Sequence, residues 1–524
     1  MMGAKIRWMV LGMCMALMYN GLVWGADAPL AKDQVVRYGS QYGDIGSLDP
    51  HFATIGSDMS ILNCIYNGLV RFPKGTIDFE KIEPDLAERW EKSADYTKWT
   101  FFLRKHVKWH KDFGELTAED VKFSIERVMD PKTGSPFRTQ FANFGEVRVL
   151  DRYTVQLVLK RPDPFLLLRV MDYQGGIVVS KKAVEKYGKD FKINPVGTGP
   201  FEFVEYRPRE RVILKRNESY FRGKPILERV EYIFMPEINS RLLAFQKGEL
   251  DCLRFADQYI PVLRSEGAII DLPWPGEYNA YFINITKKPL DDIRVRRALA
   301  HGINRKQLMK FMGEAVLGEA YSACPNGYFG HTDQVPRYDY DPVKAKELLR
   351  EAGYPNGFTM KVYMSSSETM KMTAEIIQEQ WRKIGVNMEI EIVDHSTYHS
   401  MIRKDANPVI AYNCARIPIC DIYMTQFLHS NSIVGKPTAI TNFSHYTAID
   451  EYLDKARMET DPEKQKKLYA EAQRKVLEDC VMIPTVIRPN FNGARRPYVD
   501  LGYPFKASMF YDYVFDETSR ILKH

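Results

Sequence analysis

The alternation of apolar and polar residues predicts a chain of mixed α/β structure. The clearest unit covers residues 359–394, where "TMKVYM" and "VNMEIEIV" have the pattern of strands. Between them, "MKMTAEIIQEQWRKIG" places Ile377, Trp381 and Ile384 on one face of a helix. A strand, a helix and a strand with short connections form a crossover, which requires parallel strands. We therefore expect an α/β domain in the second half of the chain.

The other elements are predicted by short strands and by residues that begin helices. The segments "WTFFLRK", "YTVQLVLK" and "RVILKRN" are strand-like and lie in the first half of the chain. Thr117 is followed three residues later by Asp120, the pattern of a capping box. Asp-Pro pairs beginning at Asp341 and Asp461 each predict a helix start. There are no repeats and no low-complexity linkers, so we expect domains that are joined by strands.

The first 25 residues have the pattern of a secretory signal peptide. Lys5 and Arg7 precede an apolar run over residues 8–24, and Gly25 provides a small residue at the expected cleavage site. No later segment is long and apolar enough to span a bilayer. The sequence therefore predicts a soluble periplasmic protein without a lipid anchor.

Composition and charge narrow the class of protein. The 524 residues are 45% apolar and 27% charged, which is typical of a globular chain with two or three domains. The formal charge of +6 falls to about +4 once Lys5 and Arg7 are removed with the signal peptide. This weak charge, without any block rich in lysine and arginine, argues against nucleic-acid binding.

Catalytic and cofactor-binding motifs are missing from the sequence. It contains no G-x-S-x-G, S-x-x-K, H-E-x-x-H or Walker A pattern. The histidine pairs His106/His110 and His395/His399 have the spacing of metal ligands on a helix. However, the first pair lies in a strand-like segment and the second has no third ligand nearby, which favours structural or solvated histidines. We therefore expect no cofactor and no metal site, and a secreted hydrolase is only a distant alternative.

Six cysteines remain after export, and an oxidising compartment permits disulfides between them. Their spacing does not rank the pairings, although a local bridge between Cys414 and Cys420 is one option. The six are Cys64, Cys252, Cys324, Cys414, Cys420 and Cys480.

Several stretches, in the same order, resemble the family 5 extracellular solute-binding proteins, the peptide/nickel-type substrate-binding components of ABC transporters. They include "NPVGTGPFEFVEYRPRERVILKRNESYF" at 194–221, "FINITKKPLDDIRVRRALAHGINRKQL" and "TDPEKQKKLYAEAQRKVLEDCVMIP", and the matches cover most of residues 35–490. The resemblance implies a two-lobed periplasmic-binding-protein fold of type II, in the large cluster C form.

The resemblance also implies the domain boundaries and the partners. Lobe I would comprise residues 34–283 and 489–524, with an extra subdomain at about 76–190, and lobe II residues 284–488. A hinge would close the lobes around a small molecule or peptide. The protein, most simply a monomer, would then deliver this ligand to the permease subunits of an ABC transporter and would itself catalyse nothing.

The loop "NCARIPICD" carries the main candidate for ligand binding. Peptide-binding members have a motif similar to GWxxDYxDP, whose first aspartate pairs with the ammonium group of the ligand. Counting back from "FLHS" places Arg416 at that aspartate and Asn413 at the tryptophan. An arginine would repel an ammonium group and favour a carboxylate or phosphate. Asp421 occupies a later acidic position and would bind the amine if the loop were shifted.

Further candidates follow from the segments that line the cleft in the family. In metal-chelate binders an arginine stands where this chain has Tyr173. For each of these residues, packing is as good an explanation as ligand contact. The set is Thr54, Ser57, Asp58, Tyr173, Gln174, Met364 and Ser365.

The leading hypothesis is a periplasmic binding protein for an anionic or zwitterionic solute, such as a modified peptide, an opine-like molecule or another acidic conjugate. The first alternative is an ordinary dipeptide or oligopeptide binder that uses Asp421. The second is a metal-chelate binder that uses His395 or His429.

Overall fold

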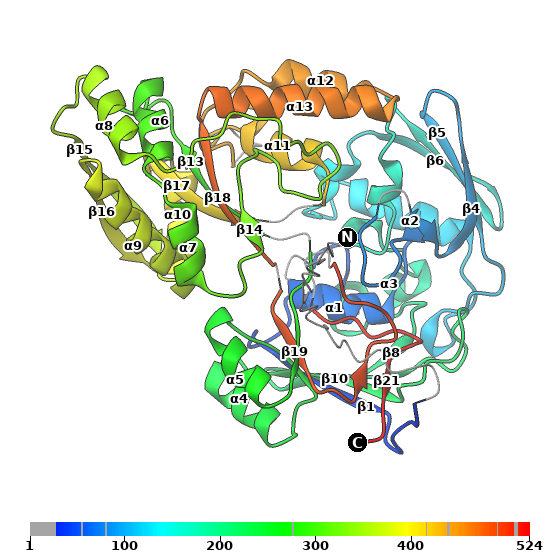
Figure 1. The fold of residues 1–524 in the computed structure, drawn as a ribbon. Helices are drawn as coiled ribbons and strands as arrows, with labels where there is room; N and C mark the ends of the chain where they lie inside the picture. The colour runs from blue at the N-terminus through cyan, green and yellow to red at the C-terminus, as the bar shows by residue number, and fades with distance from the viewer. Residues whose placement is uncertain are drawn as a thin grey trace, which may run out of the picture.

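The computed structural model has two lobes of mixed α/β structure (Figure 1). The predicted signal peptide lies outside the residues that the structure describes. Those residues are 28–53, 56–78, 81–274, 277–414, 417–436, 441–489, 491–507 and 512–524.

Lobe I is built on a seven-stranded sheet in the order β12-β19-β11-β1-β10-β9-β8. Its central strand β1 is parallel to β10 and β11, and the other neighbouring strands are antiparallel. The strands are β1 (Val35–Ser40), β8 (Phe201–Arg207), β9 (Arg211–Arg216), β10 (Arg229–Phe234), β11 (Cys252–Arg254), β12 (Ile269–Asp271) and β19 (Gly493–Arg495). The helices are α1 (Gly56–Ile65), α3 (Lys181–Tyr187), α4 (Ile238–Gln246) and α5 (Ile260–Ser265).

A second, four-stranded antiparallel sheet lies within the range predicted for the extra subdomain. Helix α2 (Ala118–Met129) packs against it. The capping box predicted for this helix is present, since the backbone N–H of Thr117 donates to Asp120 Oδ2 at 3.0 Å. The strands are β4 (Ala87–Lys92), β5 (Lys98–Leu103), β7 (Thr154–Leu159) and β6 (Phe144–Asp151) in spatial order. Two short pairs, β2 (Val70–Arg71) with β3 (Glu83–Pro84) and β20 (Val499–Asp500) with β21 (Arg520–Ile521), complete this half.

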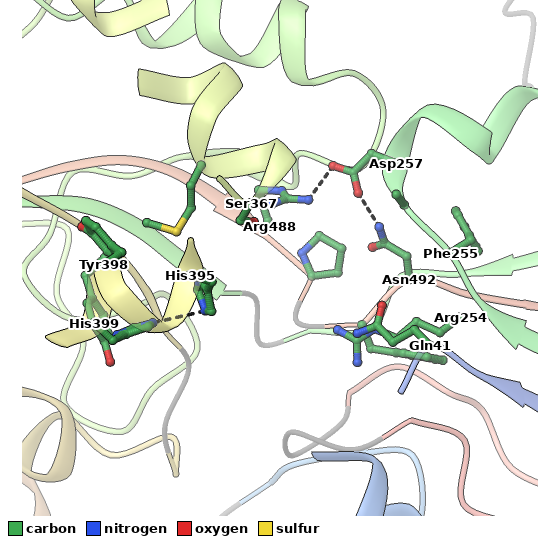
Figure 2. A pocket seen from close by; sticks show the side chains of 15 residues that line it. Gln41, Arg254, Phe255, Asp257, Ser367, His395, Tyr398, His399, Arg488 and Asn492 are labelled. Atoms are coloured by element: carbon green, nitrogen blue, oxygen red, sulfur yellow. Dashed lines mark hydrogen bonds and ion pairs between the residues drawn. The ribbon is translucent and has the colours of Figure 1, made fainter. Parts of the chain in front are cut away.

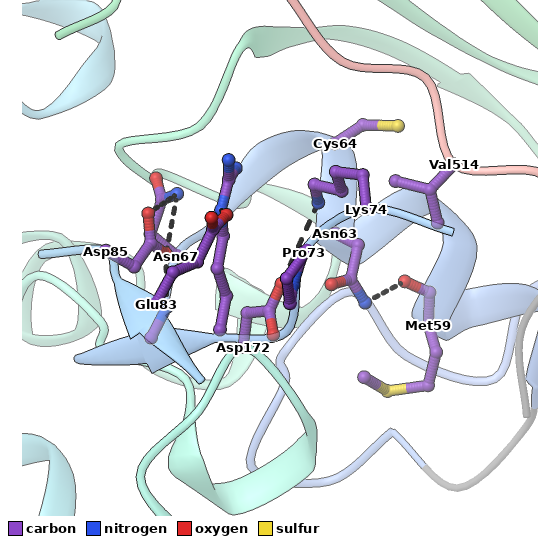
Figure 3. A network of polar contacts seen from close by, with 12 residues as sticks. Met59, Asn63, Cys64, Asn67, Pro73, Lys74, Glu83, Asp85, Asp172 and Val514 are labelled. Carbon is purple, nitrogen blue, oxygen red and sulfur yellow. Dashed lines mark hydrogen bonds and ion pairs between the residues drawn. The ribbon is translucent and has the colours of Figure 1, made fainter. Parts of the chain in front are cut away.

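A buried polar network fixes the chain that follows α1 (Figure 3). The carboxylate of Asp85 is fully buried and accepts hydrogen bonds from Asn67 Nδ2 at 3.0 Å and from the backbone of Gly68 at 3.2 Å. Nearby, Lys74 lies 3.8 Å from Asp172, a carboxyl whose pKa is raised by burial. These hydrogen bonds and this ion pair hold the chain after α1 in place.

Lobe II contains a four-stranded antiparallel sheet in the order β14-β18-β13-β17. Every residue of β18 is buried, as expected for a strand covered on both faces. The strands are β13 (Glu277–Ile283), β14 (Gly318–Glu319), β17 (Val409–Cys414) and β18 (Met482–Arg488).

The predicted strand–helix–strand unit is present in the same lobe. β15 (Phe358–Ser365) and β16 (Val386–Val393) pair in parallel and are connected by α9 (Glu368–Lys383). Trp381 on α9 is fully buried and donates its indole N–H to the backbone oxygen of Leu299 at 3.0 Å. The apolar face predicted from the sequence is therefore the one that packs on the core.

Two further helices of lobe II, α8 and α13, begin at the Asp-Pro pairs that predict them. Asp341 accepts hydrogen bonds from two backbone N–H groups at the start of α8, and Asp461 does the same for α13. Within the described part of the chain, no helix is long and apolar enough to cross a membrane. The helices are α6 (Ile293–His301), α7 (Arg305–Met312), α8 (Pro342–Glu351), α10 (His395–Arg403), α11 (Cys420–Leu428), α12 (Asp450–Met458) and α13 (Pro462–Glu478).

The chain passes between the lobes near both of the boundaries that the resemblance implies. β13 pairs with β17 and β18, so Glu277–Ile283 forms part of the lobe II sheet. β18 of that sheet leads into β19 of the lobe I sheet across the second crossing. The exact residues at which the lobes divide stay a prediction.

Candidate functional site

A polar cleft of about 450 Å³ lies between the lobes beside the second crossing (Figure 2). Lobe I and the crossing segment contribute one wall, and α9, α10 and β17 of lobe II contribute the other. The lining residues are Gln41, Arg254, Phe255, Ala256, Asp257, Ser367, Met370, His395, Tyr398, His399, Tyr412, Arg488, Pro489, Phe491 and Asn492.

Arg254, at the end of β11, is the main cation on the lobe I wall. Its Nη1 lies 2.7 Å from Oδ1 of Asp512, which is fully buried. Tyr38 donates its hydroxyl hydrogen to the other oxygen of the same carboxylate at 2.5 Å. Burial opposes the charge of Arg254, but the combined interactions with Asp512, Tyr42 and Tyr38 outweigh it, so the pKa of Arg254 lies above the ordinary value. Asp512 therefore holds Arg254 charged and in place.

A second arginine joins the two lobes at the base of the cleft. Arg488 ends β18 of lobe II, and its Nη2 lies 2.5 Å from Oδ2 of Asp257 in lobe I. Asn492 donates to the other oxygen of Asp257. Arg488 Nε and Asn492 Oδ1 are buried and have no hydrogen-bond partner in the described structure. Because such atoms are costly when they are unpaired, they are the strongest indication of a ligand in this cleft.

The lobe II wall presents aromatic and imidazole rings. α10 carries His395, Tyr398 and His399, and the Oγ of Ser365 lies 2.8 Å from Nδ1 of His395. The rings of His399 and Tyr412 are 5.7 Å apart. This wall can therefore supply both apolar ring surface and nitrogen lone pairs to a ligand.

The lobes also touch directly through residues outside the cleft lining. Phe165 of the subdomain and Phe329 of lobe II have ring centroids 5.2 Å apart. The backbone of Phe329 binds the loop before α11, donating to Pro418 at 2.9 Å and accepting from Cys420 at 3.0 Å. Ile419 in that loop is buried among lobe I side chains. We call Phe329 and residues 417–419 the rim contact.

A disulfide between Cys324 and Cys420 braces the rim contact, with an S–S distance of 2.20 Å. Because Cys420 is already bonded, the local Cys414–Cys420 bridge considered from the sequence is excluded. Cys64, Cys252 and Cys480 are buried free thiols.

Of the site residues predicted at and before the start of α11, the structure describes only the side chain of Asp421. Arg416 lies outside the described residues, and the side chain of Asn413 is likewise not described. Asp421 does not line the cleft: its Oδ1 lies 2.9 Å from Nη2 of Arg457 and 3.3 Å from the hydroxyl of Thr425. It acts as the counter-ion of Arg457: burial opposes the charge of that arginine, but the interactions with Asp421 and Asp454 together raise its pKa.

Of the candidates at residues 54–58, the structure describes only the side chain of Asp58, which does not line the cleft. Thr54 lies outside the described residues, as does the side chain of Ser57. Asp58 accepts hydrogen bonds from the backbone of Gly46 and Ser47, both at 2.9 Å, and burial raises its pKa to about 6. It stabilises the turn before α1.

The other predicted residues are structural or support the cleft indirectly. Tyr173 is 8% exposed, and Gln174 begins the short helix η5 (Gln174–Gly176) with a φ of +48°. Met364 is fully buried in the lobe II core. Ser365, next to it, is also buried but contacts His395, so it stands directly behind the cleft wall.

The two histidine pairs differ in the structure. His106 has a φ of +63° and its side chain is 86% exposed, whereas His110 is buried and bonded to the backbone oxygen of Gly199. His395 and His399 both line the cleft. His429 lies elsewhere, 3.6 Å from a carboxylate oxygen of Asp454.

None of the residues that line the cleft was among the predicted ligand-binding residues; the polar and charged ones in lobe I and at the second crossing are Gln41, Arg254, Asp257, Arg488 and Asn492. These five come from three separate segments, and only Arg488 carried a signal, as a charge at the end of a largely apolar strand.

Two α/β lobes that are crossed twice by the chain and enclose a polar cleft define a two-lobed binding protein. The sequence family described as bacterial extracellular solute-binding proteins, family 5 middle, matches residues 81–435. The chain belongs to this family of solute-binding proteins.

Individual relatives agree with this assignment. The dipeptide-binding protein of Escherichia coli K12 is 32% identical over 442 residues, covering 78% of this chain and 81% of the relative. The structure of MoaA from A. tumefaciens R10 in complex with mannopinic acid is similar with a TM-score of 0.82 and 39% identity, covering 94% of this chain and 100% of that one. DppA from Helicobacter pylori, in complex with the peptide STSA, gives a TM-score of 0.78 at 27% identity, with 93% and 98% covered.

Proposed function

We propose that this chain is the exported substrate-binding component of an ABC importer and that it captures a small anionic or zwitterionic solute. The observation that carries the proposal is the pair of arginines, Arg254 and Arg488, in a cleft closed by both lobes. The likeness to MoaA, which was solved with mannopinic acid, supports an acidic ligand.

The physical basis is the cost of burying charge. A carboxylate taken out of water between two lobes needs a charged or hydrogen-bonding partner. Arg488 has a buried, unpaired Nε–H, and Arg254 is held charged by Asp512. Asp257, on the same wall, already accepts from Arg488 and Asn492, so the contacts that the cleft offers to a solute charge are those of the arginines to an acidic group.

The two crossings between the lobes would act as the hinge that captures and releases the solute. Opening at the second crossing would separate Arg488 from Asp257 and expose the ligand, and closing would re-form the pair. The chain catalyses no reaction in this proposal. It acts in the periplasm as a monomer and presents the closed form to the permease subunits.

Acid binding is tested by thermal denaturation of the exported chain. Mannopinic acid at about 100 times its dissociation constant should stabilise the folded protein by about 2.7 kcal/mol, because it binds only the folded state. Arg488→Gln should weaken binding about 10- to 100-fold, the value of a charge-assisted hydrogen bond.

Arg474→Gln is the matched control, since Arg474 is an exposed arginine of lobe II outside the cleft. Unchanged melting with mannopinic acid and with a series of other small acids would contradict the proposal. Equal weakening in both variants would contradict the role of Arg488.

A second candidate, binding of ordinary peptides, is favoured by the two peptide-binding relatives. It requires an anionic partner for the amine, and Asp421 is engaged by Arg457. Asp421→Asn should therefore lower the free energy of unfolding by about 2 kcal/mol, less than for a fully buried pair because Arg457 is about one-third exposed. Solute binding should not change.

Urea denaturation and dipeptide titration measure the two effects. Asp454→Asn is the control, because Asp454 contacts the same arginine but is 54% exposed. Dipeptide binding that is present in the wild type and lost only in Asp421→Asn would establish the second candidate instead.

A further inference from the structure

The second crossing between the lobes carries two buried polar atoms that need a partner from outside the protein. They are Nε of Arg488 and Oδ1 of Asn492, and both residues line the cleft. We propose that Asn492 selects the solute. Its amide oxygen accepts a hydrogen bond from an uncharged donor, a hydroxyl or an amide N–H, which the solute carries in addition to its acidic group. This inference rests on the proposed function and narrows its solute class.

Asp257 decides which end of the Asn492 amide is available to a solute. A side-chain amide has one donor end and one acceptor end, whereas an ionised carboxylate only accepts. The nitrogen of Asn492 is therefore the end that contacts Oδ1 of Asp257, while Arg488 Nη2 donates to Oδ2. Figure 2 shows the nitrogen of Asn492 directed to Asp257 and its oxygen turned towards the lobe II wall. The end that is left for a solute is an acceptor, and it requires a donor.

Burial makes this requirement strong. Arg488 and Asn492 are each only 8% exposed. Within the described parts of the chain, neither Arg488 Nε nor Asn492 Oδ1 has a hydrogen-bond partner. With the lobes apart, water would solvate both atoms, and closing removes that water. A solute that supplies both an acceptor and a donor therefore stabilises the closed form more than a solute that supplies an acidic group alone.

The charges beside Asn492 favour an uncharged donor over an ammonium group. Among the described residues that line the cleft, Asp257 is the one acid, and both of its oxygens already accept hydrogen bonds. An ammonium group at Asn492 would contact an amide oxygen next to the guanidinium of Arg488, and it would lose its hydration without gaining a counter-ion. A hydroxyl or an amide N–H loses far less on leaving water. We therefore expect an acid with hydroxyl or amide groups and no amine at this position.

The acidic group and the donor would be recognised by one short segment. Arg488 ends β18 and Asn492 directly precedes β19, so both belong to the chain that joins the lobe II sheet to the lobe I sheet. Arg488 Nε–H offers a donor to the acidic group, and Asn492 offers an acceptor four residues later. Solute selection and closure of the lobes would then depend on the same residues.

Four acids of equal chain length test the inference. Caproate has no further polar group, gluconate has hydroxyls, adipamate has a carboxamide, and ε-aminocaproate has an ammonium group. Their affinities for the exported chain and for Asn492→Leu are measured by isothermal titration calorimetry at neutral pH. The variant should lower the affinity for gluconate relative to caproate, or that for adipamate relative to caproate, by about 10- to 100-fold. The ratio that falls identifies the donor as a hydroxyl or an amide.

These ratios separate recognition of the solute from support of the cleft. Asn492 also holds Asp257, and loss of that contact alone would weaken all four acids equally and leave the ratios unchanged. Asn492→Ala is measured in parallel, so that the test does not depend on the folding of the leucine variant. Asn194→Leu is the matched control, since Asn194 is an asparagine of lobe I outside the cleft lining, and it should change no affinity.

Unchanged ratios for gluconate and adipamate in the Asn492 variants overturn the inference and leave the proposed function intact. A larger fall for ε-aminocaproate than for both uncharged acids also overturns it, because the preferred donor would then be an ammonium group. So does binding of mannopinic acid without binding of gluconate or adipamate, since an acid with an uncharged donor would not be sufficient. Absence of binding of every acid overturns the proposed function itself.

Discussion

Replacing Cys324 and Cys420 together by alanine should lower the free energy of unfolding by about 2–5 kcal/mol. The bridge closes a loop between residues 96 positions apart, and the loss of entropy that it imposes on the unfolded chain grows with loop length. Urea denaturation of the variant and of the oxidised wild type measures the difference.

The wild type with its disulfide reduced should resemble the double variant. Cys480→Ala is the control for loss of a buried sulfur without loss of a bridge, since Cys480 is a free buried thiol. A double variant that is no less stable than Cys480→Ala would show that the bridge contributes nothing to stability.

Asp512→Asn should destabilise the protein by about 3–5 kcal/mol and weaken acid binding. Asp512 is fully buried and compensates the charge of Arg254, so the substitution leaves a largely buried guanidinium without its counter-ion. The change keeps the size of the side chain, and the loss therefore reports charge and hydrogen bonding, including the contact with Tyr38. Urea denaturation and acid titration measure the two effects.

Asp500→Asn provides the matched control for this experiment. Asp500 also pairs with an arginine, Arg520, but both side chains are partly exposed and lie outside the cleft. Equal stability of the two variants would mean that the buried charge of Arg254 is tolerated without Asp512.

The local structure was predictable because its causes are local. The caps at Thr117, Asp341 and Asp461 act within one turn of helix, and the strand–helix–strand unit is contiguous. The lobe to which β13 belongs was not predictable in the same way. Its residues pair with β17 and β18, which follow it by more than a hundred residues, and strand pattern does not specify a distant partner.

The cleft was less predictable than the local structure because its residues come from segments that are far apart in the chain. Arg254 and Arg488 line the same cleft only because β11 and β18 both end beside it. Asp421 had the sequence position of a ligand contact, yet its charge is used by Arg457, thirty-six residues further on. The histidine spacing on α10 was visible, but its position on the cleft wall was not.

We expect the rim contact to make ligand retention depend on the compartment in which the chain folds, because the disulfide that braces it needs an oxidising environment. The disulfide joins Cys324 to Cys420, the first residue of α11. Phe329 follows Cys324 closely in the chain, and residues 417–419 directly precede Cys420. Both parts of the rim contact, through which lobe II touches lobe I, are therefore next to the bridge. Protein made in a reducing cytoplasm would have every charged residue of the cleft in place but an unbraced loop. We expect such material to release its ligand faster than exported protein of the same sequence.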